Sequence, residues 1–281
     1  MIFCFAPLIR GARAAAFAAA NGGLPLDINS RFRLDNRTAL ITGAGRGIGR
    51  ACAIALAQAG AEVWLAARTK DEIEQAAAEI RAAGHRAHAV VCDVTKSDEM
   101  RKVVSAIPVL DVLVNNAGGN IPEPFVEVSE EHLDRLMDLN LRSAFLTAQS
   151  AAKKMLEAPD RKTRGGAIIN MSSQMGHVGS VNRSVYCMTK HGLEGLTKAM
   201  ALELAAHGIR VVSIAPTFIE TPMTKPFMAR PGFAEWVHER IPAGRVGQAE
   251  EVANAVLFAA SPAASLVTGT SLLVDGGWTA Q

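Results

Sequence analysis

Apolar and polar positions alternate in a regular way from Thr38 onward. Short apolar runs precede longer stretches in which apolar residues recur every three or four positions, which is typical of buried strands followed by amphipathic helices. The apolar runs predict strands near 38–42, 61–67, 86–91, 111–114, 166–171, 209–214 and 270–274. The longer stretches predict helices near 47–59, 69–83, 97–106, 130–157, 184–206 and 249–260. This alternation predicts an α/β fold with a doubly wound parallel sheet of about seven strands and helices on both faces.

The first 33 residues do not follow this rhythm. An apolar start, Ile2 to Ile9, comes before Arg10 and Arg13 and an alanine run. A signal peptide carries its positive charges before its apolar segment, and no apolar run approaches the ~18 residues that span a bilayer. We therefore expect residues 1–33 to form a loosely ordered extension and the protein to have no membrane partner; a targeting segment is the alternative.

Composition narrows the possible partners and the compartment. Lysines and arginines are interleaved with acids, and the net charge of +2 gives no basic groove for nucleic acid, so we expect a small-molecule substrate. The four cysteines are far apart and form no CxxC pair, which argues against a disulfide framework or a zinc site and is consistent with the cytoplasm. His85, His88 and Cys92 follow one predicted strand without a fourth ligand, so we expect no metal.

A glycine-rich turn follows the first predicted strand and leads directly into a helix. Glycine can take positive φ angles, and its missing Cβ lets a phosphate approach the free N–H groups at the helix N-terminus. The turn, read from Thr42, has the pattern TGxxxGxG and supplies the candidate dinucleotide contacts Gly43, Gly45, Arg46, Gly47, Ile48 and Gly49. In this motif the chain resembles the short-chain dehydrogenase/reductase family.

Further segments in the family's order extend the resemblance over about residues 34–281. It implies one Rossmann-type catalytic domain over 34–281 that binds a dinucleotide, with a lid near 217–245. It also implies cofactor contacts by Asp93, Val94, Asn115, Ala117, Gly118, Pro216, Ile219 and Thr221. In the family the asparagine at position 115 largely braces the sheet. Thr217 stands where the family's PGxIxT segment has glycine, which is a departure in the nicotinamide loop.

The end of the second predicted strand bears on the choice of cofactor. An NAD enzyme usually places a carboxylate there for the ribose 2′-hydroxyl, whereas this chain has Ala67 followed by Arg68. Arg46 lies in the glycine turn on the same side. Because two guanidinium groups suit a 2′-phosphate, we expect NADP to be preferred over NAD.

Tyr186 is the only tyrosine and stands four residues before Lys190 at the start of a predicted helix. Positions i and i+4 share a helix face, and a phenol with a pKa of ~10 needs a nearby cation to act as an acid or base near neutral pH. Ser173 follows the fifth predicted strand, where its hydroxyl can bond a reacting oxygen. Ser172 is the competing serine.

The resemblance completes this group as a catalytic tetrad of Asn140, Ser173, Tyr186 and Lys190. It implies that Tyr186 exchanges the proton, that Ser173 orients the carbonyl and that Lys190 lowers the tyrosine pKa and binds the ribose. Asn140 is implied to hold a water for proton relay. The function expected on this basis is hydride transfer between NADP(H) and a ketone or secondary alcohol. A catalytically silent dinucleotide-binding regulatory protein on the same fold is the alternative.

Polar residues near the expected nicotinamide site indicate the kind of substrate. Gln174 and His177, with Phe218, are the candidate substrate contacts, and an apolar ligand would leave the polar members unpaired. We expect a small polar substrate such as a sugar acid or a 3-oxoacyl thioester. Arg183, Lys225 and Arg230 suggest that it carries a negative group, although they could equally be solvated charges at the rim. The family resemblance implies a homotetramer.

Overall fold

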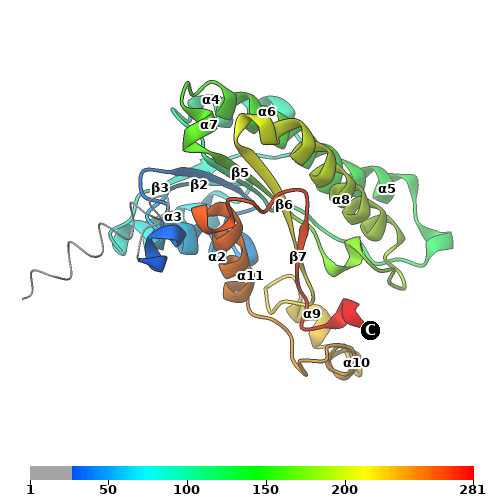
Figure 1. The fold of residues 1–281 in the computed structure, drawn as a ribbon. Coiled ribbons are helices and arrows are strands. Elements are labelled where there is room, and N and C mark those ends of the chain that lie inside the picture. The colour runs from blue at the N-terminus through cyan, green and yellow to red at the C-terminus, as the bar shows by residue number, and fades with distance from the viewer. Residues whose placement is uncertain (1–26) are drawn as a thin grey trace, which may run out of the picture.

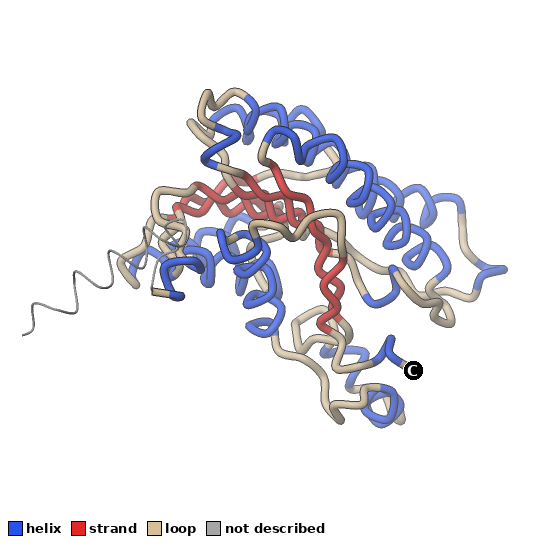
Figure 2. The backbone as a smooth tube through the Cα atoms, viewed as in Figure 1, coloured by secondary structure: helices blue, strands red, loops and turns tan. Residues whose placement is uncertain are grey.

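The computed structural model describes residues 27–281, and within them seven strands form one parallel sheet (Figures 1 and 2). The strands are β1 (Thr38–Thr42), β2 (Glu62–Ala67), β3 (Ala87–Val91), β4 (Val112–Asn115), β5 (Gly166–Met171), β6 (Ile209–Pro216) and β7 (Ser271–Val274). They lie in the order β3-β2-β1-β4-β5-β6-β7. The order reverses between β1 and β4, and the crevice beyond the carboxyl ends of such strands is where ligands of this architecture bind.

Helices cover both faces of the sheet (Figure 1). One face carries α2 (Gly47–Gln58), α3 (Lys70–Ala82) and α11 (Ala249–Ala260), and the other carries α4 (Ser97–Ala106), α6 (Ser143–Leu156) and α8 (Ser184–Leu204). Two apolar clusters, one on each side, form the core. The central strands are therefore mostly apolar, and all four residues of β4, including the polar Asn115, are buried. The expected doubly wound α/β fold is confirmed.

The segment 130–157, predicted as one helix, is interrupted. It consists of α5 (Glu130–Met137), a π-helical turn over Asp138–Arg142, and α6. Within the turn the Ser143 N–H bonds the Asp138 carbonyl, five residues back, instead of the carbonyl four residues back. The amphipathic pattern continues through the turn, so hydrophobic periodicity gave no sign of it.

Several short elements were not predicted, because they are too short to show a hydrophobic period. They include α7 (Arg161–Arg164) and, within the expected lid, α9 (Lys225–Met228) and α10 (Phe233–Arg240). The C-terminal Trp278 contacts this lid, since its ring centroid lies 5.7 Å from those of Phe218 and Trp236. Aromatic packing therefore ties the end of the chain to the lid.

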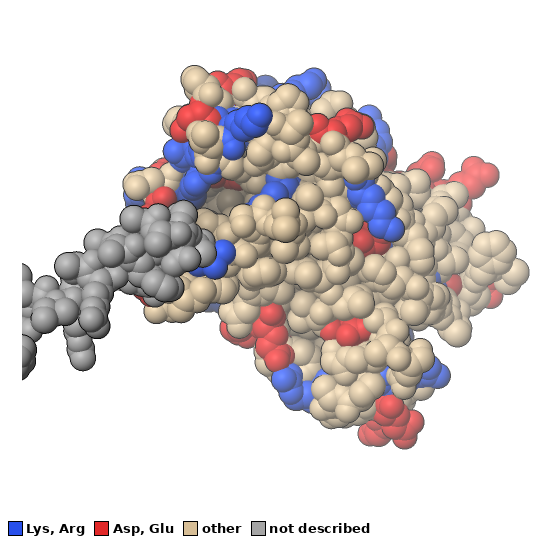
Figure 3. Space-filling model, viewed as in Figure 1, with Lys and Arg blue, Asp and Glu red and all other residues tan. Residues whose placement is uncertain are grey.

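Residues 1–26 of the expected N-terminal extension lie outside the described residues. The remainder of that extension contains a 3₁₀ helix at Ile28–Phe32, and the Phe32 ring lies 6.4 Å from that of Phe258 in α11. Charges of both signs are interspersed over the face that Figure 3 presents. No helix within residues 27–281 combines the length and apolarity that crossing a bilayer requires.

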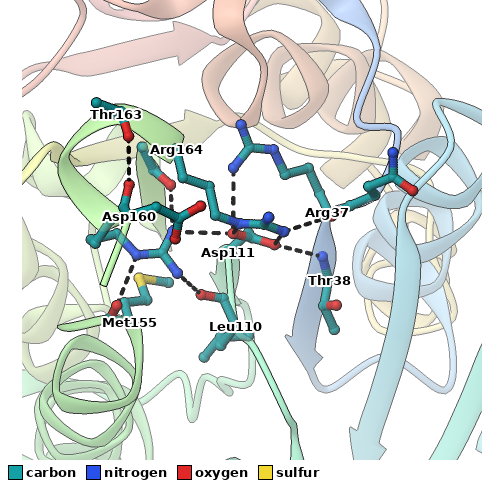
Figure 4. A network of polar contacts seen from close by, with 11 residues as sticks. Arg37, Thr38, Leu110, Asp111, Met155, Asp160, Thr163 and Arg164 are labelled. Atoms are coloured by element: carbon teal, nitrogen blue, oxygen red, sulfur yellow. Dashed lines mark hydrogen bonds and ion pairs between the residues drawn. The ribbon is translucent and has the colours of Figure 1, made fainter. Parts of the chain in front are cut away.

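A buried ionic cluster closes the amino-terminal edge of the sheet (Figure 4). Asp111, just before β4, is 1 % exposed and accepts hydrogen bonds from the Thr38 N–H at 3.0 Å, from Arg161 at 3.1 Å and from Arg164 at 2.8 Å. Arg37 adds a longer contact of 3.4 Å. Burial alone would raise the pKa of Asp111, but the hydrogen bonds from Arg164, Thr38 and Arg161 lower it below its usual value. The cluster fastens β1, β4 and α7 together.

Candidate active site

The glycine turn lies between β1 and the N-terminus of α2, as expected. Gly43 has a φ of +64°, and a Cβ on Gly49 would lie 2.3 Å from the Gly43 carbonyl oxygen. Both positions therefore require glycine, which leaves the turn's backbone close to the cavity that the turn lines. The free N–H groups at the N-terminus of a helix favour an anion, so the turn at the start of α2 fits the pyrophosphate of a dinucleotide.

Asn116 holds this turn, although it is not among the predicted site residues. Its side-chain Nδ2 donates to the carbonyls of Thr42 and Gly43 at 2.9 and 3.2 Å. The Thr42 hydroxyl accepts the backbone N–H groups of Asn116 and Ala117, each at 3.0 Å. Its place in Asn115-Asn116-Ala117-Gly118, directly after the fourth predicted strand, was the available signal, because an amide that follows a buried strand needs polar partners.

Tyr186, Ser173 and Lys190 come together at the carboxyl end of β5. Lys190 Nζ lies 5.5 Å from the centroid of the Tyr186 ring and donates a 2.7 Å hydrogen bond to the Met171 carbonyl. Burial lowers the pKa of Lys190 to about 8, although the charge of Glu194, one turn further along α8, raises it. Lys190 can therefore gain and lose a proton near neutral pH.

The surroundings of Tyr186 contain groups that raise the pKa of its phenol and groups that lower it. Burial raises its pKa above the ordinary value, while a hydrogen bond with the Ser173 side chain and the charge of Arg183 lower it. Ser173 Oγ also accepts the Met175 N–H at 3.2 Å, which fixes the hydroxyl. A buried, protonated phenol beside an oriented hydroxyl can donate a proton to a substrate oxygen.

Asn140 lies in the π-helical turn and is 2 % exposed. Its amide accepts the Gly119 N–H at 2.8 Å and donates to the Gly119 carbonyl at 2.9 Å and to Thr189 Oγ1 at 3.2 Å. The Thr189 hydroxyl in turn donates to the Tyr186 carbonyl at 2.8 Å. Asn140 therefore connects the loop after β4 to the first turn of α8, which carries the tyrosine.

One cavity joins the glycine turn to the catalytic side chains. Most of the expected cofactor residues line it: Gly43, Gly45, Arg46, Gly47, Ile48, Gly49, Arg68, Val94, Ala117, Gly118, Tyr186, Lys190, Pro216, Ile219 and Thr221. Ser173 and the competing Ser172 also line it, together with residues that were not predicted from the sequence, among them Glu72, Leu139 and Thr224. The two arginines proposed for the 2′-phosphate differ, because Arg46 pairs with Glu72 at 3.1 Å whereas Arg68 forms no ion pair within residues 27–281.

Two expected cofactor residues have other partners. Asp93 Oδ1 accepts the N–H and the hydroxyl of Thr95 at 3.0 and 2.8 Å, which caps its own loop. Asn115 is buried and donates to the Ala144 carbonyl at 2.8 Å. Asn115 therefore braces the sheet against α6.

The three expected substrate contacts do not line this cavity. Gln174 is 1 % exposed, and its Oε1 has no hydrogen-bond partner within the described part of the chain. His177 Nε2 lies 3.0 Å from Ser271 Oγ and 3.4 Å from Glu194 Oε1, so its ring is tied to β7 and α8. Phe218 packs edge-on against Phe233. Sequence spacing placed these residues near the site but could not give the direction of their side chains.

Comparisons with known proteins agree with this geometry. The family model described as enoyl-(acyl carrier protein) reductase matches residues 43–279. L-xylulose reductase of Mus musculus is 38% identical over 249 residues, which are 88% of this chain and 98% of that protein. Gluconate 5-dehydrogenase of Gluconobacter oxydans is 38% identical over 253 residues, covering 88% of this chain and 96% of that protein.

A solved structure resembles the whole described domain. It is a gluconate 5-dehydrogenase from Burkholderia cenocepacia J2315 in complex with NADP and tartrate, 35% identical, with a TM-score of 0.86. The match covers 91% of this chain and 100% of that one. Since the glycine turn, the Tyr186–Lys190 pair and these relatives agree, the chain belongs to the short-chain dehydrogenase/reductase family and is an oxidoreductase that uses a nicotinamide dinucleotide.

Proposed function

We propose that the protein transfers a hydride between NADP(H) and the ketone or secondary alcohol of a small polar substrate, preferably a sugar acid. The observation that carries this proposal is the continuous cavity that runs from the glycine turn to Tyr186, Ser173 and Lys190. A silent regulatory protein on the same fold would have no need of a lysine buried beside the tyrosine ring.

Each residue of the site has a separate part in the proposed reaction. A bound nicotinamide dinucleotide supplies or accepts the hydride. Tyr186 gives its phenolic proton to the substrate oxygen during reduction and takes it back during oxidation. Ser173 donates a hydrogen bond to the same oxygen, and Lys190, when protonated, favours the phenolate. Asn140 fixes the loop at Gly119 and, through Thr189, the turn of α8 that carries Tyr186.

Preference for NADP rests mainly on Arg68. Ala67 ends β2 without a carboxylate, and the exposed Arg68 side chain follows it at the rim of the cavity. Arg46 contributes less, because its charge is already paired with Glu72. A single unpaired guanidinium is sufficient to favour a 2′-phosphate over a hydroxyl.

The choice of a sugar acid draws on the relatives and on the site. The gluconate 5-dehydrogenases are named for a sugar acid, and the solved one is in complex with tartrate, a dicarboxylate. Another relative is named for L-xylulose, which is a neutral sugar. The family model is named for the acyl carrier protein, so 3-oxoacyl thioesters are the second candidate. Ser172 and Thr217 line the cavity, and their side-chain oxygens have no hydrogen-bond partner within residues 27–281, which favours the hydroxyl-rich candidates.

The test is the oxidation of NADPH by the purified protein with 5-ketogluconate, L-xylulose and an acetoacetyl thioester. We expect the highest kcat/KM with the keto acid and little turnover with NADH. If the protein binds NADPH but reduces none of the three ketones, the assignment as an enzyme is contradicted and a catalytically silent binding protein is favoured.

We also propose a homotetramer in the cytoplasm. Phe145 and Met188, on α6 and α8, expose 47% and 46% of their surface, and an apolar groove between these helices is lined by Met137, Leu141, Leu146 and Leu196 among others. Such a surface suits an interface between subunits. Sedimentation velocity and cell fractionation test the two statements, and a monomer that sediments unchanged at all concentrations would refute the first.

A further inference from the structure

Two arginines from separate parts of the chain meet at one aromatic ring. Phe227 belongs to α9 in the lid, and the guanidinium carbon of Arg230 lies 4.9 Å from its centroid. The guanidinium carbon of Arg183, the residue just before α8, lies 5.8 Å from the same centroid. The ring of Phe227 is thus contacted by one cation from the lid and by one from the residue that precedes α8.

Neither charge has an acidic partner within the described part of the chain. Within residues 27–281 neither arginine forms an ion pair with an acidic side chain, and the one hydrogen bond of the Arg183 side chain there goes to the Asn182 carbonyl at 3.2 Å. Arg183 is half-buried: desolvation lowers its pKa, the charge of Tyr186 raises it, and the charge of Arg230 lowers it. Guanidinium groups without an acidic partner attract an anion.

Their position relates this pair to the reaction. Arg183 stands three residues before Tyr186 and directly precedes α8. The charge of Arg183 lowers the pKa of Tyr186. Arg183 therefore acts electrostatically on the residue that exchanges the proton.

The backbone before α8 holds Arg183 in place. Asn182 has a φ of +58°, in the left-handed region, which asparagine adopts more readily than most other non-glycine residues. Its carbonyl accepts the Glu123 N–H at 3.1 Å, which fixes this residue to the segment after β4.

We propose that Arg183 and Arg230 form a clamp that binds the carboxylate of the substrate, with both guanidinium groups packed against the Phe227 ring. The inference rests on the proposed function and makes it more specific, because it selects keto acids over neutral ketoses. Each guanidinium donates hydrogen bonds to the carboxylate, so the lid contributes Arg230 and the residue before α8 contributes Arg183.

The test compares three variants, Arg183→Gln, Arg230→Gln and the control Arg240→Gln. Arg240 stacks on Trp236 at 4.8 Å in the same lid and forms no ion pair within the described residues, so it controls for the loss of a stacked cation. For 5-ketogluconate we expect each clamp variant to lower kcat/KM ~10–100-fold. For the methyl ester with Arg230→Gln, and for both substrates with Arg240→Gln, we expect little change. Arg183→Gln should lower kcat/KM for the ester less than for the acid, because the only loss for the ester comes from the higher pKa of Tyr186.

A second measurement does not depend on turnover. Calorimetry of D-gluconate binding to the NADP complex should show weaker binding in both clamp variants and in high salt, with NADP affinity unchanged. Equal loss for the acid and its ester, or gluconate binding that ignores both arginines, would overturn the clamp while leaving the oxidoreductase assignment intact. If no ketone is reduced, binding that depends on Arg183 and Arg230 still supports the clamp, and only the proposed reaction fails.

Discussion

The two edges of the sheet treat buried polar groups in opposite ways. At the amino-terminal edge, Asp111 is bonded by one backbone N–H and by arginines, and the arginine side chains also bond neighbouring carbonyls. At the carboxyl-terminal edge, within the described residues, buried side-chain oxygens of Ser172 and Thr217 have no partner, and both residues line the cavity. Since an unpaired buried polar atom costs ~1–3 kcal/mol, the first edge stabilises the fold, whereas the second offers polar atoms that a ligand in the cavity can bond.

This contrast predicts separable defects. A substitution at the carboxyl edge should change activity with little effect on stability, and a substitution at the amino edge should do the reverse. Both edges belong to the same strands, so the difference lies in the side chains and loops that each edge carries.

The largest expected effect is on turnover. Tyr186→Phe removes the phenolic proton and should lower kcat ~10²–10⁴-fold while the dissociation constant of NADPH and the melting temperature stay nearly unchanged. Stopped-flow reduction and cofactor fluorescence measure the two quantities. A phenylalanine variant that kept more than about a tenth of its rate would break the assignment of Tyr186 as the acid.

The amino edge should show the opposite behaviour. Asp111→Asn leaves the buried Arg161 guanidinium, 4% exposed, without its counter-charge and should lower the free energy of unfolding by ~3–5 kcal/mol, with normal kcat in the folded fraction. Because the folded pKa of Asp111 is lowered, its contribution is present above its unfolded pKa and is lost as the pH falls through the folded value.

A surface pair provides the control for this experiment. Asp98→Asn removes an acid that is 83% exposed and pairs with Arg101, so urea unfolding should change by less than ~1 kcal/mol. If the two variants were equally stable, the cluster at Asp111 would not be what holds this edge.

A smaller effect is expected on cofactor choice. Arg68→Gln should raise KM for NADPH ~10–100-fold and leave KM for NADH almost unchanged, because only the 2′-phosphate is affected. Arg46→Gln should cost less, since Arg46 already pairs with Glu72. Equal losses with both cofactors would make Arg68 structural, and a wild-type preference for NADH would reject the NADP proposal.

The smallest predicted effect is a shift in pH dependence. Reduction should decline as the pH rises through about 8, where Lys190 loses its proton. The charge of Glu194 raises the pKa of Lys190, so Glu194→Gln should move this decline to lower pH by up to ~1 unit. Glu203→Gln, at an exposed position near the end of α8, is the control, and identical profiles for all three proteins would exclude Glu194 as a positioning residue.

The fold followed from periodicity because both faces of the sheet are buried. Continuous apolar strands and amphipathic helices alternate without interruption, and glycine is required where the first turn approaches α2. The motif residues that meet at the cavity could likewise be found by spacing, since most follow the carboxyl end of a strand or begin a helix, and Lys190 stands four residues after Tyr186 on the same helix.

Contacts between distant elements could not be found in this way. Nothing in the sequence around His177 indicates that its ring turns to Ser271 and Glu194, which come from β7 and α8. The pairing of Arg46 with Glu72, which weakens its role as a phosphate ligand, depends on the approach of α3 to the glycine turn. Side-chain direction is decided by packing partners that a single sequence does not reveal.

The π-helical turn at Asp138–Arg142 makes the length of this helix more critical than its composition. Each residue of an α-helix turns the chain by ~100°, so removing one residue from the turn would restore regular geometry and rotate α5 by that angle relative to α6. Asn140 would then point away from Gly119 and Thr189. Loss of a single residue here would therefore be far more damaging than most exchanges of one residue for another, and engineers who shorten or graft this helix must preserve its residue count.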